Sequence, residues 1–156
     1  MTRMSKLQSK MGGPAGQLDK AAIVLAAQRN LDAVTPKIEL ALEEQRQVLR
    51  AALSQTEPPL QDIFGAAHQI RGMAGSIGRP SLGALADVLA TYITECVDAG
   101  LVCAEVPLRA LASALDRSFD QAEDDALSIE TLAAAKHLAR LFGPARRSAK
   151  VDFVRS

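Results

Sequence analysis

Apolar residues recur at three- and four-residue spacings along most of the chain, and prolines or glycines interrupt the pattern at intervals. This spacing is typical of amphipathic helices, which repeat every 3.6 residues, and almost no stretch alternates as a strand would. The pattern predicts an all-α fold with six helical stretches. They cover about residues 18–31, 35–55, 59–77, 82–96, 107–122 and 128–142.

The boundary between the first two stretches depends on Thr35 and Pro36. Threonine can cap a helix N-terminus, and proline suits the first position of a helix. We therefore expect a new helix to begin at this pair. The later connections are short, which favours antiparallel neighbours.

Composition and net charge narrow the possible domain number, fold and partners. A chain of 156 residues fits one ordinary domain. Apolar residues make up 48% and aromatic residues 3%, so the core must be built from small and aliphatic side chains, which favour helices. Eighteen basic residues balance eighteen acidic ones, and no basic stretch is interleaved with aromatics, so nucleic acid is not an expected partner.

Cysteine use and the lack of long apolar runs bear on location. Cys96 and Cys103 have neither the spacing of a disulfide scaffold nor that of a zinc site, so both are expected to be reduced core residues. The N-terminal segment lacks the apolar run of a signal peptide, and no segment has eighteen uninterrupted apolar residues. We expect a cytoplasmic protein without a membrane partner.

The chain divides into three parts. Residues 1–16 have no clear period and end in glycines and a proline, which predicts a flexible leader. Residues 17–143 are predicted to form a single helical domain. Residues 144–156 follow a glycine–proline stop and predict a basic, flexible tail.

The third stretch carries His68, one of two histidines in the chain. On a helical wheel its apolar stripe lies about 120° away from this histidine, so the imidazole is expected to point to solvent. Gly72 and Gly75 flank His68 on the same side. Each glycine costs about 1 kcal/mol relative to alanine in a helix, so we infer that this face needs empty space. The stripe consists of Ile63, Ala67, Ile70, Ala74 and Ile77.

A candidate docking patch surrounds His68. Phe64 gives it a large apolar group, and the glycines leave the histidine ring sterically open to a partner. Two other interpretations stay open: the glycines could permit close helix packing, and Phe64 could belong to the core. The patch residues are Gln61, Phe64, Gly65, Arg71, Gly72 and Gly75.

The motif His68-Gln69-Ile70-Arg71-Gly72, with Gly78 ten positions after the histidine and Leu82 beyond it, resembles the histidine-containing phosphotransfer (HPt) domain family. The resemblance covers about residues 35–124. It implies an antiparallel four-helix bundle, here with additional N- and C-terminal helices, in which His68 is phosphorylated. Arg71 stands where the family usually has lysine.

These residue types suit phosphoryl transfer. A neutral imidazole nitrogen can act as the nucleophile, and Arg71, one turn away, can support phosphoryl oxygens with charge-assisted hydrogen bonds. The resemblance implies exchange with aspartyl phosphates on response-regulator receiver domains and a hybrid histidine kinase upstream, the receiver supplying Mg²⁺. The chain itself is expected to be a monomer that binds no cofactor or metal and has no kinase activity of its own.

Two other functions remain open. His68 to Arg71 also resembles part of a histidine-kinase dimerisation helix, but Met73 replaces the usual proline and no glycine-rich ATP-binding domain follows. A helical adaptor could instead bind a receiver or another protein without being phosphorylated. His137 lies in no motif and is not expected to be a second site. The acidic residues Asp116, Asp120, Glu123, Asp124 and Asp125 are expected to form a solvated face.

Overall fold

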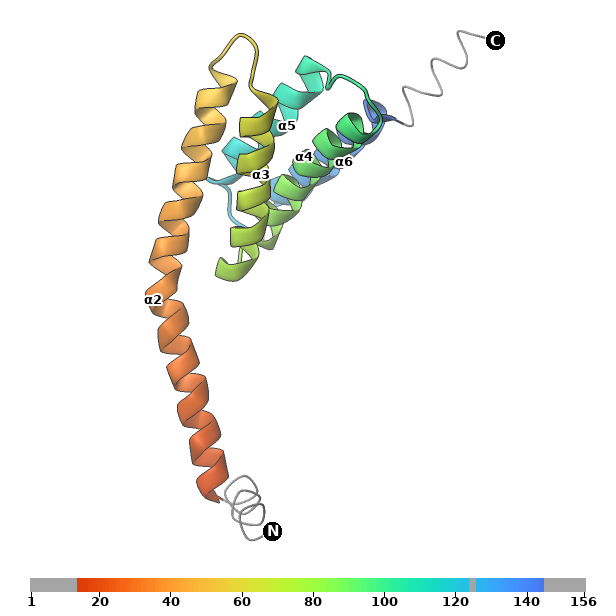
Figure 1. Cartoon of the computed structure of the whole chain (residues 1–156). Helices are drawn as coiled ribbons and strands as arrows, with labels where there is room; N and C mark the ends of the chain where they lie inside the picture. The colour runs from red at the N-terminus through yellow and green to blue at the C-terminus, as the bar shows by residue number, and fades with distance from the viewer. Residues whose placement is uncertain (1–13, 124–125, 145–156) are drawn as a thin grey trace, which may run out of the picture. The chain divides into compact units, whose positions relative to one another are not determined.

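The computed structural model describes residues 14–123 and 126–144 (Figure 1). Within these ranges no strand occurs, which confirms the all-α prediction. Residues 1–13 of the predicted 1–16 leader and the tail beyond Pro144 lie outside the described residues, whereas residues 14–16 begin the first described helix. The helices are α2 (Pro14–Leu53), α3 (Leu60–Ala74), η1 (Gly75–Ile77, a 3₁₀ turn), α4 (Pro80–Asp98), α5 (Glu105–Ser118) and α6 (Ala126–Leu141).

The predicted break at Thr35 and Pro36 is wrong, because helix α2 continues through both residues. Proline within a helix removes one backbone hydrogen bond, but it does not by itself force an end. The hydroxyl of Thr35 donates to the carbonyl of Leu31 over 2.7 Å, a bond within the helix rather than a cap on a new one. No glycine lies between Leu31 and Pro36 to terminate the first stretch.

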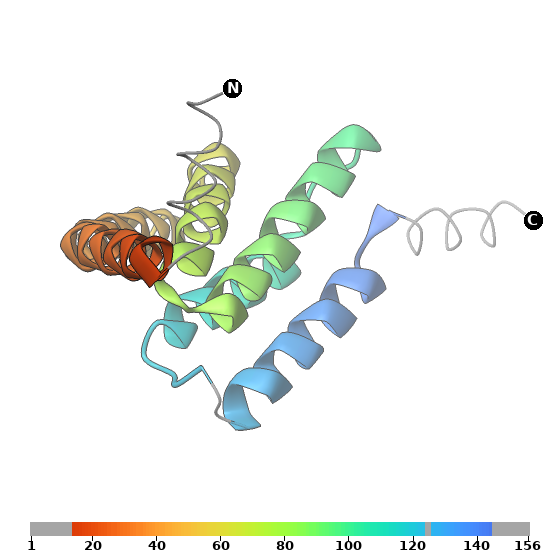
Figure 2. The same cartoon turned by 90° about the horizontal axis from the view of Figure 1, so that it is seen from below.

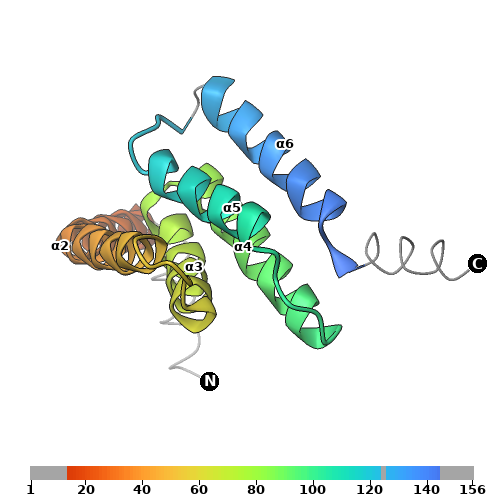
Figure 3. The same cartoon turned by 90° about the horizontal axis from the view of Figure 1, so that it is seen from above.

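The chain forms two compact units, residues 1–38 and 39–156. The second unit contains the C-terminal part of α2, from residue 39, together with α3 to α6. In it, α3 packs against α4, α4 packs against both α5 and α6, and α5 packs against α6. Figures 2 and 3 show α6 running beside the α4–α5 pair. The fully buried side chains of the second unit include Leu49, Ile63, Ile70, Leu89, Leu111 and Leu115.

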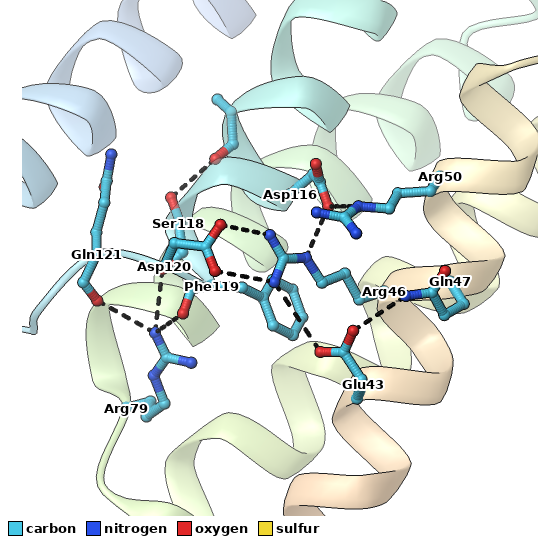
Figure 4. A network of polar contacts seen from close by, with 11 residues as sticks. Glu43, Arg46, Gln47, Arg50, Arg79, Asp116, Ser118, Phe119, Asp120 and Gln121 are labelled. Atoms are coloured by element: carbon cyan, nitrogen blue, oxygen red, sulfur yellow. Dashed lines mark hydrogen bonds and ion pairs between the residues drawn. The ribbon is translucent and has the colours of Figure 1, made fainter.

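A polar network joins α2 to the end of α5 within the second unit (Figure 4). The buried guanidinium of Arg46 donates to Asp116 over 2.8 Å and to Asp120 over 2.7 and 3.1 Å. Arg50 donates to the same oxygen of Asp116 over 2.8 Å. Arg46 also lies 5.0 Å from the centre of the Phe119 ring, a cation–π contact. These ion pairs therefore link α2 to the C-terminal end of α5.

The α3–α4 connection is tied to the residues after α5. Nη2 of Arg79 donates to the backbone carbonyls of Ser118, Phe119 and Gln121 over 3.0 to 3.3 Å. The carboxylate of Glu123 accepts from the backbone nitrogen of Ser81 over 2.8 Å, which satisfies a free donor at the start of α4.

The acidic segment is therefore not simply a solvated face. That prediction is wrong for Asp116 and Glu123, whose side chains are 20% and 21% exposed, whereas Asp120 is 73% exposed and is also paired with Arg46. Arginines on α2 and at the start of α4 are brought opposite these carboxylates by the fold. Asp124 and Asp125 lie outside the described residues. Cys96 and Cys103 are both buried, as expected for core residues. No helix in the described ranges is long and apolar enough to cross a membrane.

Candidate functional site

The rotation of α3 about its axis places His68 at the surface. Ile63, Ala67, Ile70 and Ala74 are completely buried, which fixes that face against the core. His68 lies on the opposite side and is exposed, as the helical wheel predicts. Ile77, the last residue of the predicted stripe, lies in η1 and is half-buried.

The C-terminal end of this region is set by Gly78. Its φ is 71°, in the left-handed region that side-chain-bearing residues rarely adopt. The next residue, Arg79, donates its backbone N–H to the carbonyl of Ala74 over 2.9 Å, which closes the helix end. The glycine ten positions after His68 thus has a structural reason: it turns the chain from α3 into α4.

The imidazole of His68 lies between an aromatic ring and a cation. Phe64, one turn earlier, stacks on it with ring centroids 5.9 Å apart and an interplanar angle of 17°. Nη2 of Arg71, one turn later, lies 3.4 Å from Nδ1. In the described part of the chain, Nε2 has no hydrogen-bond partner. The ring is therefore supported along the helix while one nitrogen remains available.

Asp87 on α4 extends this group to a second helix. Its Oδ1 accepts a hydrogen bond from Nη1 of Arg71 over 2.9 Å, and both side chains are about half exposed. Arg71 thus bridges Asp87 and His68. Asp87 could not be identified from the sequence, because no local motif marks it and its proximity to Arg71 depends on how α4 packs along α3.

The three glycines of the predicted patch have open space beside them. A Cβ atom built on Gly65, Gly72 or Gly75 meets no atom within 4 Å, which contradicts the helix-packing interpretation of Gly72 and Gly75. The close approach of α3 and α4 occurs at Gly83 instead. A Cβ there would lie 3.5 Å from the Cβ of Ala74 and 3.7 Å from the carbonyl oxygen of Arg71.

An apolar groove of about 340 Å³ adjoins the site between α3 and α4. Two of the predicted docking residues, Gln61 and Phe64, line it, whereas Gly65, Gly72 and Gly75 do not. The α4 side of the groove was not predicted from the sequence. Its complete lining is Leu60, Gln61, Phe64, Ile93, Thr94, Val97 and Asp98.

The remaining candidate chemistry lies elsewhere or is not found in the described residues. His137 is exposed on α6 and belongs neither to the groove nor to the His68 contacts. Over residues 14–123 and 126–144, no cluster of three or more histidine, cysteine or acidic side chains could hold a metal ion.

Comparison with known proteins gives one match. The family described as Hpt domain matches residues 39–141, which is more than half of the chain. No curated protein and no solved structure matches at a significant level. The matched range contains His68, the groove and every described helix of the second unit, including α6. The chain therefore belongs to the Hpt domain family.

Proposed function

We propose that His68 is the phosphoryl-accepting residue of this Hpt domain and that the chain relays phosphoryl groups between receiver domains in the cytoplasm, with a hybrid histidine kinase upstream. Membership of the family implies histidine phosphotransfer in a phosphorelay. The observation that supports His68 is its exposed ring beside Arg71, with Nη2 3.4 Å from Nδ1.

In the proposed step, Nε2 of His68 attacks the phosphorus of an aspartyl phosphate on the receiver. The nitrogen lone pair forms the N–P bond, and the electron pair of the breaking P–O bond leaves with the receiver's carboxylate. The attacking tautomer carries its proton on Nδ1, and this proton stays on the ring. Transfer to a second receiver reverses these bond changes.

Arg71 supplies positive charge in this step. When Nδ1 carries the proton, it cannot accept a hydrogen bond from Nη2 of Arg71, so Nη2 is available for phosphoryl oxygens. Nη1 remains anchored by Asp87 over 2.9 Å, which keeps the guanidinium next to the ring. Charge stabilisation of this kind is a main protein contribution to phosphoryl transfer.

In this proposal the receiver supplies the Mg²⁺ ion and the acidic pocket around its aspartate. The open space beside Gly72 and Gly75 supports close approach of that pocket to His68. The groove beside Phe64 offers apolar surface to the same partner, since Val97 on its rim is 56% exposed.

The test is transfer from a radiolabelled phosphoreceiver with Mg²⁺ to the full chain. Wild type is expected to acquire an acid-labile, base-stable label, and His68→Gln to acquire none. His137→Gln, which removes the other exposed histidine, is the matched control and should be labelled as wild type is. Equal labelling of His68→Gln, or loss of label in His137→Gln, would overturn the assignment. Receiver binding without any labelling of wild type would favour the adaptor function.

The groove has its own test. Val97→Asp places a charge in the proposed docking surface, and we expect it to weaken receiver binding by at least about tenfold. Val106→Asp is the matched control, because Val106 is also exposed but does not line the groove. Isothermal titration with the receiver measures both. Equal affinities of the two variants would place the docking surface elsewhere.

A further inference from the structure

The first unit carries exposed apolar side chains along helix α2. Every residue from 19 to 34 is exposed on helix α2. Val24 is 65% exposed and Leu31 is 57% exposed. Isolated exposed apolar residues are ordinary, but a contiguous row of them along a helix marks an interaction surface.

These residues follow a heptad pattern. The spacings alternate strictly between three and four residues, which keeps the side chains on one face of the helix and gives the a and d positions of a coiled coil. We call this row of residues the α2 stripe. Its a positions are Val24, Leu31 and Ile38, and its d positions are Ala27, Val34 and Ala41.

The same face of α2 is already a packing surface further along the helix. At three- and four-residue steps from Ile38, the positions continue through Leu42, Gln45, Leu49 and Ala52. Leu42, Leu49 and Ala52 are 3%, 0% and 1% exposed, because the bundle of the second unit covers them. On helix α2 the stripe is therefore in phase with side chains that pack in the core of the second unit.

We propose that the α2 stripe pairs with the stripe of a second copy of this chain, forming a short coiled-coil dimer. Two identical heptad faces are self-complementary, so one surface suffices for a closed pair. No charged residue occurs at the a and d positions from Val24 to Ala41.

A lipid surface fits this segment less well. Helices that lie on membranes are usually rich in basic residues on the polar face and carry aromatic anchors. Residues 19–39 contain no aromatic residue, and their charges cancel, with three basic and three acidic side chains. Those charges are Asp19, Lys20, Arg29, Asp32, Lys37 and Glu39.

The dimer departs from the monomer implied by the family resemblance, and it is independent of the proposed phosphotransfer role. All residues of the α2 stripe except Ala41 precede the family match, which begins at residue 39. Dimerisation would give one assembly two copies of His68.

Sedimentation equilibrium of the full chain over a range of concentrations tests the proposal. Wild type is expected to show a monomer–dimer equilibrium. Leu31→Lys places a charge in the paired seam and should raise the Kd by at least about tenfold. Leu25→Lys is the matched control, because Leu25 is 52% exposed but lies at a b position outside the seam.

A second pair of variants tests the opposite direction. Ala27→Leu enlarges a d position and should lower the Kd, whereas Ala26→Leu, at a neighbouring c position, should leave it unchanged. A monomeric wild type at all concentrations, or equal effects of Leu31→Lys and Leu25→Lys, would overturn the proposal. Wild type that stays monomeric and sediments with anionic phosphatidylglycerol vesicles would assign the α2 stripe to a membrane surface instead.

Discussion

Arg71 on α3 and Asp87 on α4 form an ion pair of 2.9 Å that holds the arginine beside His68. Both side chains are about half exposed, so the pair contributes little to folding stability, below about 1 kcal/mol. Its geometric effect is larger, because it fixes one terminal nitrogen of Arg71 and leaves the other next to Nδ1. Asp87 is therefore interpreted as a positioning residue for Arg71.

Asp87→Asn should slow phosphoryl transfer without unfolding the domain. We expect about a tenfold lower single-turnover rate from a phosphoreceiver, because Arg71 loses the charge that anchors it. Asp87→Glu should recover part of that rate. Glu105→Gln breaks another exposed ion pair, with Arg109, away from His68 and should leave transfer unchanged. A wild-type rate in Asp87→Asn would remove the positioning role.

Gly72 should show stability and transfer changing in opposite directions. Gly72→Ala is expected to raise the free energy of unfolding by about 1 kcal/mol, because alanine favours a helix and its Cβ meets no neighbour. Gly72→Leu should remain folded but slow transfer, since its side chain would occupy space that the receiver needs. Ala134→Leu, at an exposed position of α6, is the control for added bulk. Unimpaired transfer by Gly72→Leu would show that the space is not required.

Much of the fold could be predicted from apolar spacing and from prolines and glycines. The buried face of α3 follows directly from its period, and Gly78 ends that region as a left-handed glycine. Thr35 and Pro36 predict a helix start, yet α2 continues through both residues. A single proline favours a boundary but does not decide one when the flanking residues can all remain helical.

Only the α3 part of the site could be predicted from the sequence. Residues on one helix share a face through a fixed geometry, so His68, Phe64 and Arg71 could be grouped from α3 alone. Asp87 and the α4 side of the groove depend on the packing of two helices, which no spacing within one helix specifies. The same limitation applies to Asp116, whose arginine partners lie 66 and 70 positions away in the sequence.

Arg46 and Arg50 offer a matched comparison of burial. Both donate to Asp116 over 2.8 Å, but the Arg46 side chain is 8% exposed and that of Arg50 is 46% exposed. Arg46→Met should lower the free energy of unfolding by about 2–3 kcal/mol, because it removes a buried charge that two carboxylates share. Arg50→Met should cost below about 1 kcal/mol. Urea unfolding followed by circular dichroism measures both, and equal losses would contradict the argument from burial.

The contact between Asp120 and Arg46 should make the bundle less stable in acid. Its hydrogen bond from Arg46 lowers the pKa of the Asp120 carboxyl below its ordinary value. As the pH falls, the Asp120 carboxyl is therefore protonated at a higher pH in the unfolded chain than in the folded one. The stabilisation from this contact is complete above the unfolded pKa, at about 3.9. It is then lost as the pH falls through the lower pKa of the folded state.

We therefore expect urea midpoints of wild type to fall between about pH 4 and pH 2, and Asp120→Asn to lose less over the same range. Asparagine cannot change its charge, so the contribution of this carboxylate to the acid limb disappears. Glu130→Gln, on exposed α6, is the control for removing one carboxylate and should keep the wild-type profile. If Asp120→Asn has the same acid limb as wild type, the contact with Arg46 does not set the acid sensitivity of the fold.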